Sequence, residues 1–113
     1  MTSTPQEILT RHLQATIAED LDAIVADYAD DAVLLTPNGV TRGKDGIRKV
    51  FTALFADLPR ANWRLVTQTF ADDVLLLEWS AEAESRRVED GIDTFVFREG
   101  LIRAQTVRYT LIG

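Results

Sequence analysis

Residues 20–32 read DLDAIVADYADDA, and the hydrophobic pattern changes within this stretch. Asp20 is an aspartate, one of the residue types preferred at the N-cap position of a helix. The apolar residues that follow it recur at helical spacing: Leu21, Ile24, Val25 and Tyr28. The acidic pair Asp30-Asp31 interrupts the pattern, and residues 32–36 then read as a short strand. The stretch therefore predicts a short helix that leads directly into a strand.

Longer helices are predicted on both sides of this stretch. Residues 4–7, Thr-Pro-Gln-Glu, form a capping box with proline at the first helical position. The buried stripe of that first helix is expected to be Ile8, Leu9, His12, Leu13, Thr16 and Ile17. A turn at residues 37–39, Pro-Asn-Gly, precedes a third helix, which Pro59 ends. Its apolar positions are Ile47, Val50, Phe51, Leu54, Phe55 and Leu58.

After Pro59 the apolar period changes from helical to two. Residues 62–70, 74–83, 87–98 and 101–112 are predicted as strands, and the connections between them are short. Short connections require antiparallel neighbours, because a parallel crossover needs a dozen or more residues. One sheet with all its helices in one half of the chain predicts an α+β domain, with the helices on one face and a hollow beneath them.

The composition sets limits on function. The chain has 113 residues, a net charge of −6, 46% hydrophobic residues and no cysteine. This length suits one domain, residues 1–113, and the missing cysteine excludes disulfides and thiolate metal sites. The acidic charge argues against nucleic acid or an anionic membrane as a partner. No apolar run approaches the roughly 20 residues of a membrane span, and no signal peptide is visible, so we expect a soluble cytoplasmic protein.

The element order and residues 20–32 resemble the nuclear transport factor 2-like (NTF2-like) superfamily, within it the SnoaL-like polyketide cyclases and bacterial ketosteroid isomerases. The resemblance covers nearly the whole chain. It implies a cystatin-like cone, in which three N-terminal helices pack on a curved antiparallel sheet around a pocket. This fold hosts enzymes of several kinds as well as non-catalytic domains, so the resemblance says little about the chemistry.

The isomerase pattern of that superfamily is only partly present. At the position of its general base, an aspartate before a proline, this chain has Thr36 followed by Pro37. A helix tyrosine that forms half of the oxyanion hole is replaced by His12. The other half, a protonated aspartate, matches Asp93. A threonine hydroxyl is no base near neutral pH, so the chain is not expected to be a ketosteroid isomerase by the usual mechanism.

Asp93 and His12 are the expected catalytic residues. Asp93 shares a strand face with Phe95 and Phe97, and an apolar site raises the pKa of a carboxyl group. The alternative is a solvated aspartate at a strand end. His12, the single histidine, either fills the core or lies in the pocket, where the resemblance places it beside Asp93.

One ambiguity concerns the strand that contains Glu78. Alternation places Glu78 on one face of it and Trp79 on the other, and either face can line the hollow. Glu78 is then a second pocket carboxylate, or it lies on a polar outer face that can form a dimer interface.

Further residues are expected around the ligand. The last strand offers Gln105, Val107 and Tyr109 on one face, and the resemblance directs that face inward. The other expected binding or wall residues are Tyr28, Thr36, Phe51, Phe55, Trp63, Glu78 and Phe95. Histidine and carboxylates show no spacing typical of a metal site, and no glycine-rich phosphate loop is present, so neither a metal nor a cofactor is expected.

Two functions remain open. One is a small cofactor-independent isomerase, cyclase or lyase that acts on an apolar carbonyl compound through Asp93 and His12. The other is a non-catalytic, ligand-binding or accessory domain, which the loss of the base at Thr36 favours. In both, apolar residues on the two faces of the sheet predict a homodimer.

Overall fold

The computed structural model describes residues 2–113, which form three helices and six strands. The first helix, α1 (Pro5–Ala18), begins at the predicted capping box: the Thr4 side chain accepts a hydrogen bond from Glu7 N–H, and the Glu7 side chain accepts one from Thr4 N–H. It ends at Glu19, whose φ of 53° is left-handed. The short helix α2 (Leu21–Ala26) follows, capped by the Asp20 side chain. Both helix starts are therefore where the sequence predicts them.

The first strand is longer than predicted. β1 (Tyr28–Thr36) begins four residues before residue 32, because Tyr28 already pairs with Ile102. The register between β1 and the last strand shifts after Tyr28, and Asp30 and Asp31 are exposed at this irregularity. A tight turn then leads into β2 (Gly39–Arg42) and into the helix α3 (Gly43–Asp57).

The remaining strands follow the predicted order. They are β3 (Asn62–Ala71), β4 (Val74–Glu82), β5 (Arg87–Arg98) and β6 (Leu101–Arg108), and each is antiparallel to the next. Within residues 2–113 the sheet order is β2-β1-β6-β5-β4-β3, and β1 runs parallel to β6. β6 ends at Arg108 rather than at residue 112, although Ile112 still bridges to Arg87.

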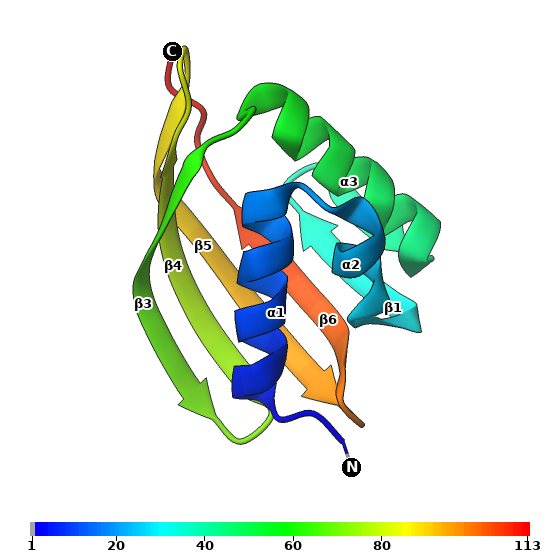
Figure 1. Cartoon of the computed structure of the whole chain (residues 1–113). Coiled ribbons are helices and arrows are strands. Elements are labelled where there is room, and N and C mark those ends of the chain that lie inside the picture. Colours follow the sequence, from blue (N-terminus) through cyan, green and yellow to red (C-terminus); the bar gives the residue numbers. More distant parts are fainter. Residues whose placement is uncertain (1) are drawn as a thin grey trace.

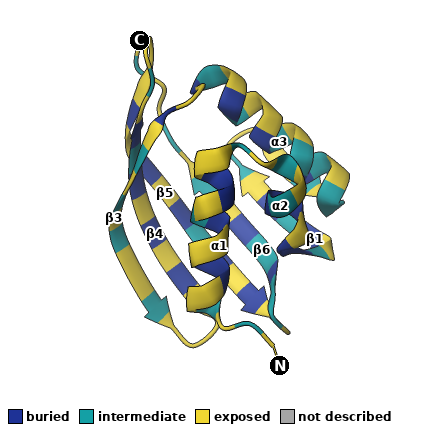
Figure 2. Ribbon diagram, in the orientation of Figure 1, coloured by how far each residue is buried: buried dark blue, intermediate teal, exposed yellow. Residues whose placement is uncertain are grey.

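The helices lie on one face of the curved sheet, as Figure 1 shows. The α+β cone expected from the sequence is thus confirmed. The most buried side chains lie between the two layers (Figure 2), and they include Ile8, Ile24, Leu34, Ile47 and Phe95. Ile17 was predicted in the buried stripe of α1, but it is 57% exposed, and Ala15 is buried instead.

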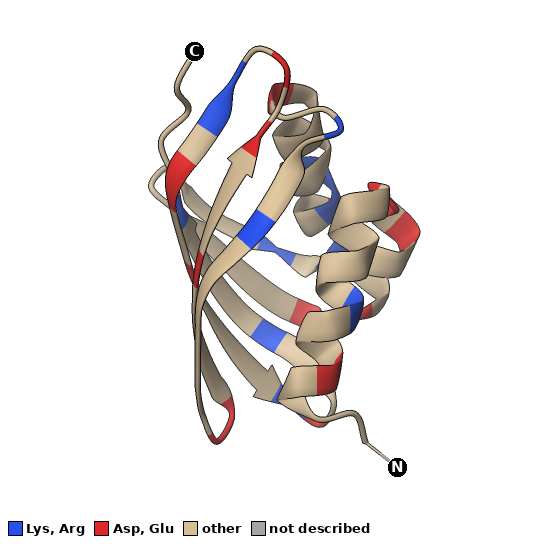
Figure 3. Ribbon diagram, turned by 60° about the vertical axis from the view of Figure 1, so that its left-hand side comes forward, with Lys and Arg blue, Asp and Glu red and all other residues tan. Residues whose placement is uncertain are grey.

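Charged side chains of both signs are dispersed over strands and helices (Figure 3). None of the helices in residues 2–113 has the length and apolar character needed to cross a membrane.

Candidate functional site

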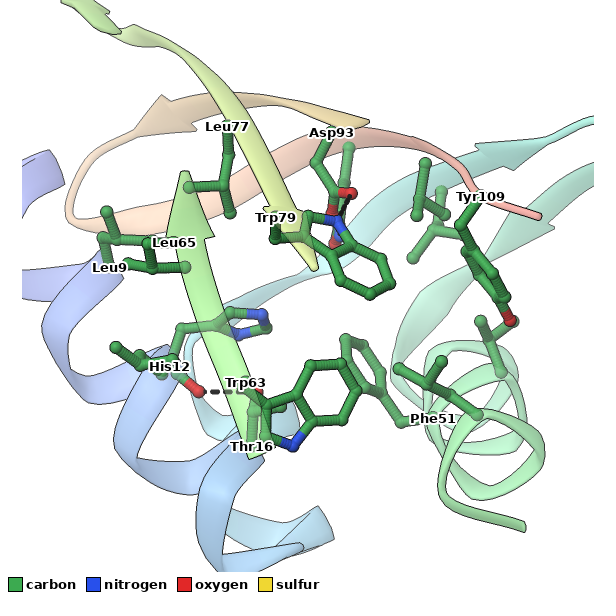
Figure 4. A pocket seen from close by; sticks show the side chains of 16 residues that line it. Leu9, His12, Thr16, Phe51, Trp63, Leu65, Leu77, Trp79, Asp93 and Tyr109 are labelled. Atoms are coloured by element: carbon green, nitrogen blue, oxygen red, sulfur yellow. Dashed lines mark hydrogen bonds between the residues drawn. The ribbon is translucent and has the colours of Figure 1, made fainter. Parts of the chain in front are cut away.

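A chamber of about 70 Å3 lies between the helices and the concave face of the sheet. Most of its wall is apolar or aromatic, and Figure 4 shows the side chains that surround it. The lining residues are Leu9, His12, Leu13, Thr16, Leu34, Val50, Phe51, Leu54, Trp63, Leu65, Leu77, Trp79, Asp93, Gln105, Val107 and Tyr109. Pockets for drug-sized ligands have roughly 300–1,000 Å3, so this chamber has room only for a small molecule or for one end of a larger one.

Asp93, on β5, is the carboxylate of the chamber. It is 6% exposed, and each of its oxygens accepts one hydrogen bond. Trp79 Nε1–H donates to Oδ1 over 2.8 Å, and Gln105 Nε2–H donates to Oδ2 over 2.7 Å. Burial raises the pKa of Asp93 to about 6, although both hydrogen bonds act in the opposite direction. Each oxygen retains a lone pair for a ligand.

Gln105 is itself held in place from behind. The hydroxyl of the fully buried Tyr28 donates a hydrogen bond to Gln105 Oε1, which leaves the amide N–H group pointing at Asp93. Burial also raises the pKa of Tyr28 well above its usual range, so this hydroxyl keeps its proton. The chain Tyr28–Gln105–Asp93 therefore fixes the position of the carboxylate.

The Trp79 indole fills a space that is open because Gly91, on the neighbouring strand, has no side chain. Gly91 is its cross-strand partner on β5, and a Cβ atom added at Gly91 would overlap the indole ring. The glycine thus lets the indole lie flat against the β5 backbone, with its N–H group directed at Asp93.

His12, on α1, lies on the helix side of the chamber (Figure 4). Its ring makes edge contacts with Phe95, Phe51 and Tyr28 at centroid distances of 5.5, 5.6 and 6.3 Å. Burial lowers the pKa of His12 to about 4, against the opposing field of Asp27. Within residues 2–113, its Nδ1 atom has no hydrogen-bond partner. His12 is therefore a neutral imidazole at physiological pH.

The predicted contact between His12 and Asp93 is not formed. Both side chains line the chamber, but no hydrogen bond joins them within residues 2–113, where Asp93 binds Trp79 and Gln105 instead. The reason is geometric: one residue comes from the helix layer and the other from the sheet, with the chamber between them.

Five of the expected binding residues line the chamber: Phe51, Trp63, Gln105, Val107 and Tyr109. Tyr28, Phe55 and Phe95 do not line it. They are buried in the core, since the aromatic rings in front of them already form the wall.

Two of the expected binding residues, Thr36 and Glu78, do not line the chamber. Thr36 ends β1 at the hairpin, where its Oγ1 accepts a hydrogen bond from Asn38 N–H over 3.1 Å and stabilises the turn. Glu78 is exposed on the outer face, and Trp79 faces inward.

Trp79 is the chief residue that the sequence did not assign. Its face of β4, with Leu75, Leu77 and Ala81, is free of charge, whereas the other face carries Glu78 and Glu82. That contrast was the available signal for burial. Leu9, Leu13, Thr16, Leu34, Val50, Leu54, Leu65 and Leu77 were not expected as lining residues either. As for metals, residues 2–113 contain no group of three or more His, Asp or Glu side chains arranged to hold an ion.

Solved structures share this fold. IdmH from Streptomyces antibioticus, a candidate polyketide cyclase, is 17% identical with a TM-score of 0.80, over 95% of this chain and 92% of that one. A SnoaL-like protein of unknown function from Burkholderia thailandensis is 20% identical with a TM-score of 0.77, over 93% of each chain. An NTF2-like protein of unknown function from Cytophaga hutchinsonii is 10% identical with a TM-score of 0.79, over 97% of this chain and 93% of that one.

No curated protein matches the sequence. The family model of the SnoaL-like domain, in contrast, matches residues 9–105, from the first chamber residue on α1 to the glutamine that holds Asp93. The chain therefore belongs to the SnoaL-like domain family of the NTF2-like superfamily.

Proposed function

We propose that the protein moves a proton at the carbon next to the carbonyl group of a small apolar compound, without a cofactor. The observation that carries this proposal is the buried Asp93 carboxylate, held by two neutral N–H donors in the wall of an apolar chamber. With a pKa of about 6, Asp93 is mostly ionised at neutral pH, yet it is a stronger base than a solvated aspartate.

In the proposed step, Asp93 takes a proton from the α carbon. The electron pair of the C–H bond becomes the C=C bond of an enolate, and the electrons of the C=O double bond move to the oxygen. Return of the proton to another carbon completes an isomerisation, and attack of the enolate carbon on a second carbonyl closes a ring. Loss of a leaving group from the β carbon is an elimination. All three reactions begin with the same transfer, and the likeness to IdmH supports ring closure.

The enolate oxygen needs a hydrogen-bond donor, and in this proposal His12 is that donor. His12 lines the chamber, and its neutral imidazole carries one N–H group. In this proposal His12 positions and polarises the carbonyl, and Asp93 alone moves the proton.

The test is deuterium exchange into cyclopentanone in D2O, followed by NMR. We expect the wild-type protein to accelerate exchange of the α hydrogens, and Asp93→Asn to lower the acceleration by about 10²–10⁴-fold, as for loss of a general base. Glu82→Gln, which removes an exposed carboxylate from β4, is the matched control and should exchange like the wild type. Exchange that survives in Asp93→Asn contradicts the proposal. No acceleration with any small ketone would favour the non-catalytic binding domain.

A β,γ-unsaturated ketosteroid serves as a negative substrate. Thr36, where steroid isomerases have their base, lies outside the chamber, and about 70 Å3 cannot hold four fused rings. We therefore expect no conversion by the wild-type protein, measured by the ultraviolet absorbance of the conjugated product. Robust turnover would show that another base reaches the steroid.

We also propose that the protein is a homodimer, joined through the outer face of the sheet. Exposed apolar side chains lie there in cross-strand register: Val74 pairs with Val96, and Leu76 lies opposite Thr94. Ile92 pairs with Glu78 on the same face, and Leu35 extends the patch onto β1. Helices cover only the other face (Figure 1), so a second copy is the partner that buries this patch symmetrically.

A further inference from the structure

Two rows of side chains cross the outer face of the sheet, from β4 over β5 to β6. The pairing of the three strands places Leu76, Thr94 and Thr106 in one row, and Glu78, Ile92 and Arg108 in the next. All of them are exposed except Thr94, which is half-buried. The second row therefore has an acidic end on β4 and a basic end on β6, with the apolar Ile92 between them.

The two charges have no partner within their own chain. Neither Glu78 nor Arg108 takes part in an ion pair within residues 2–113. The field of Arg108 helps to lower the pKa of Asp90, but both Asp90 oxygens accept hydrogen bonds from Thr110, one from its N–H group and one from its hydroxyl. Each of the two charges is therefore open to a group from a second molecule.

The first row differs in shape between its two ends. At the β6 end, a hollow of about 290 Å3 lies between side chains that include Leu35, Thr94 and Thr106. At the β4 end, Leu76 is 38% exposed on the same face. One end of each row thus complements the other end: an acid and a base in one row, an apolar side chain and a hollow in the other.

We propose that two copies of the chain associate about a two-fold axis that runs along β5. Glu78 of each protomer then forms an ion pair with Arg108 of its partner, and Leu76 of each enters the hollow of the other. This inference rests on the homodimer proposed above and adds to it the orientation of the two copies and the residues that select it.

The geometry of sheet packing leaves two directions for the axis. In a face-to-face dimer the axis lies in the plane between the sheets, and aligned sheets keep their strand directions within about 30° of each other, so it runs along the strands or across them. β4 and β6 flank β5 (Figure 1), each at about 4.8 Å. An axis along β5 exchanges these two sides, so that β4 of each protomer lies against β6 of its partner.

An axis across the strands gives the opposite result. It sets β4 against the partner's β4 and β6 against the partner's β6, so the acidic ends of the rows meet each other, as do the basic ends. Like charges that face each other across an interface weaken association. Both the charges and the hollow therefore favour the axis along β5.

The test is an exchange of charges, with the dissociation constant of the dimer measured by analytical ultracentrifugation at low salt. We expect Glu78→Arg and Arg108→Glu each to raise this constant about 100-fold, because two like-charge contacts replace two ion pairs. An equimolar mixture of the two single variants should form heterodimers about as tightly as the wild type dimerises, because every contact again joins opposite charges. The double variant Glu78→Arg/Arg108→Glu should dimerise alone for the same reason.

Net charge is controlled separately. Glu78→Arg changes the net charge of the chain by two units, from −6 to −4, so general repulsion between copies falls and cannot explain a weaker dimer. Lys49→Glu, on the exposed side of α3, has the same charge change as Arg108→Glu and should dimerise like the wild type.

The outcomes separate the axis from the dimer. With an axis across the strands, each single variant only exchanges one like-charge or unpaired contact for another. Single variants that dimerise as tightly as the wild type therefore overturn the axis along β5 and leave the homodimer standing, and so does a mixture that stays monomeric. A monomeric wild type overturns the homodimer and its axis together.

Discussion

The two faces of the sheet differ in how they treat polar groups. On the inner face, Asp93, Trp79 and Gln105 are buried and satisfy one another through hydrogen bonds. On the outer face, Glu78 and Glu82 stand in solvent beside exposed apolar residues such as Leu76 and Val74. Buried polar groups that hold each other fix a geometry, which a ligand site needs. Exposed apolar side chains that form no hydrogen bonds can be buried by any surface of complementary shape, which is typical of contact with another protein.

Introduction of a charge on the outer face is expected to have the largest effect. Leu76→Arg places a charge in the centre of the proposed dimer interface, where an unpaired buried charge is not tolerated. Light scattering at micromolar concentration should give twice the 12.6 kDa chain mass for the wild type and a single chain mass for the variant. Gln14→Arg, on the exposed side of α1, should stay dimeric. A monomeric wild type contradicts the interface.

On the inner face, Gly91→Ala should be the most harmful small substitution. The added methyl group displaces the Trp79 indole, and overpacking of this kind costs about 1–3 kcal/mol of the free energy of unfolding. Loss of the indole hydrogen bond should also raise the pKa of Asp93 further, measured from its carboxyl carbon by NMR.

A double-mutant cycle separates this explanation from a general strand effect. In the Trp79→Phe background the smaller ring leaves room for the methyl group, so Gly91→Ala should cost much less there. Equal costs in both backgrounds would show that Gly91 does not act through Trp79.

Asp93→Asn should stabilise the protein at pH 7. Because the pKa of Asp93 is raised to about 6 in the folded state, the folded protein holds this proton more tightly than the unfolded chain. Stability from this group is present at low pH and is lost as the pH rises through 6. We expect a gain of about 1–2 kcal/mol at pH 7 that shrinks towards pH 4. Gln105 can turn its amide to receive the asparagine N–H group, and chemical denaturation at the two pH values measures the difference. A loss of several kcal/mol would instead identify a structural role.

His12→Leu should show the opposite dependence on pH at a smaller scale. The pKa of His12 is lowered from 6.5 in the unfolded chain to about 4 in the folded protein. The neutral imidazole therefore contributes its full share of the folding free energy above pH 6.5, and this contribution is lost as the pH falls from 6.5 towards 4. Leucine binds no proton. Between pH 7 and pH 5 the free energy of unfolding should therefore fall by about 1 kcal/mol less in the variant than in the wild type. In the wild type the Asp93 and His12 effects partly cancel. Equal acid sensitivity in both proteins would place His12 in contact with water.

Local pattern was enough to predict most of the fold. The capping box at Thr4, the turn at Pro37 and the period-two strands are set by neighbouring residues, and the structure has them. Pairing between distant segments was not predictable. The parallel contact of β1 with β6 lengthens β1 back to Tyr28, and only the tertiary fold provides that partner.

For the site, the sequence placed Asp93, Gln105 and Tyr109 on strand faces that do line the chamber. It could not give the distance across the chamber, and the contact between His12 and Asp93 was expected only from the resemblance. Residue types alone also left Trp79 and Glu78 undecided, because alternation defines two faces without saying which is concave. The glycine opposite Trp79 acquires its meaning only when the strands are in register.

The two hydrogen bonds on Asp93 also have a stereochemical consequence. A carboxylate held at both oxygens cannot turn, and it approaches a ligand from the strand side of the chamber only (Figure 4). The two hydrogens of a CH2 group next to a carbonyl are mirror-related, and a single fixed base reaches one of them. The exchange should therefore be stereospecific: in each such CH2 group, one hydrogen is replaced by deuterium and the other is retained.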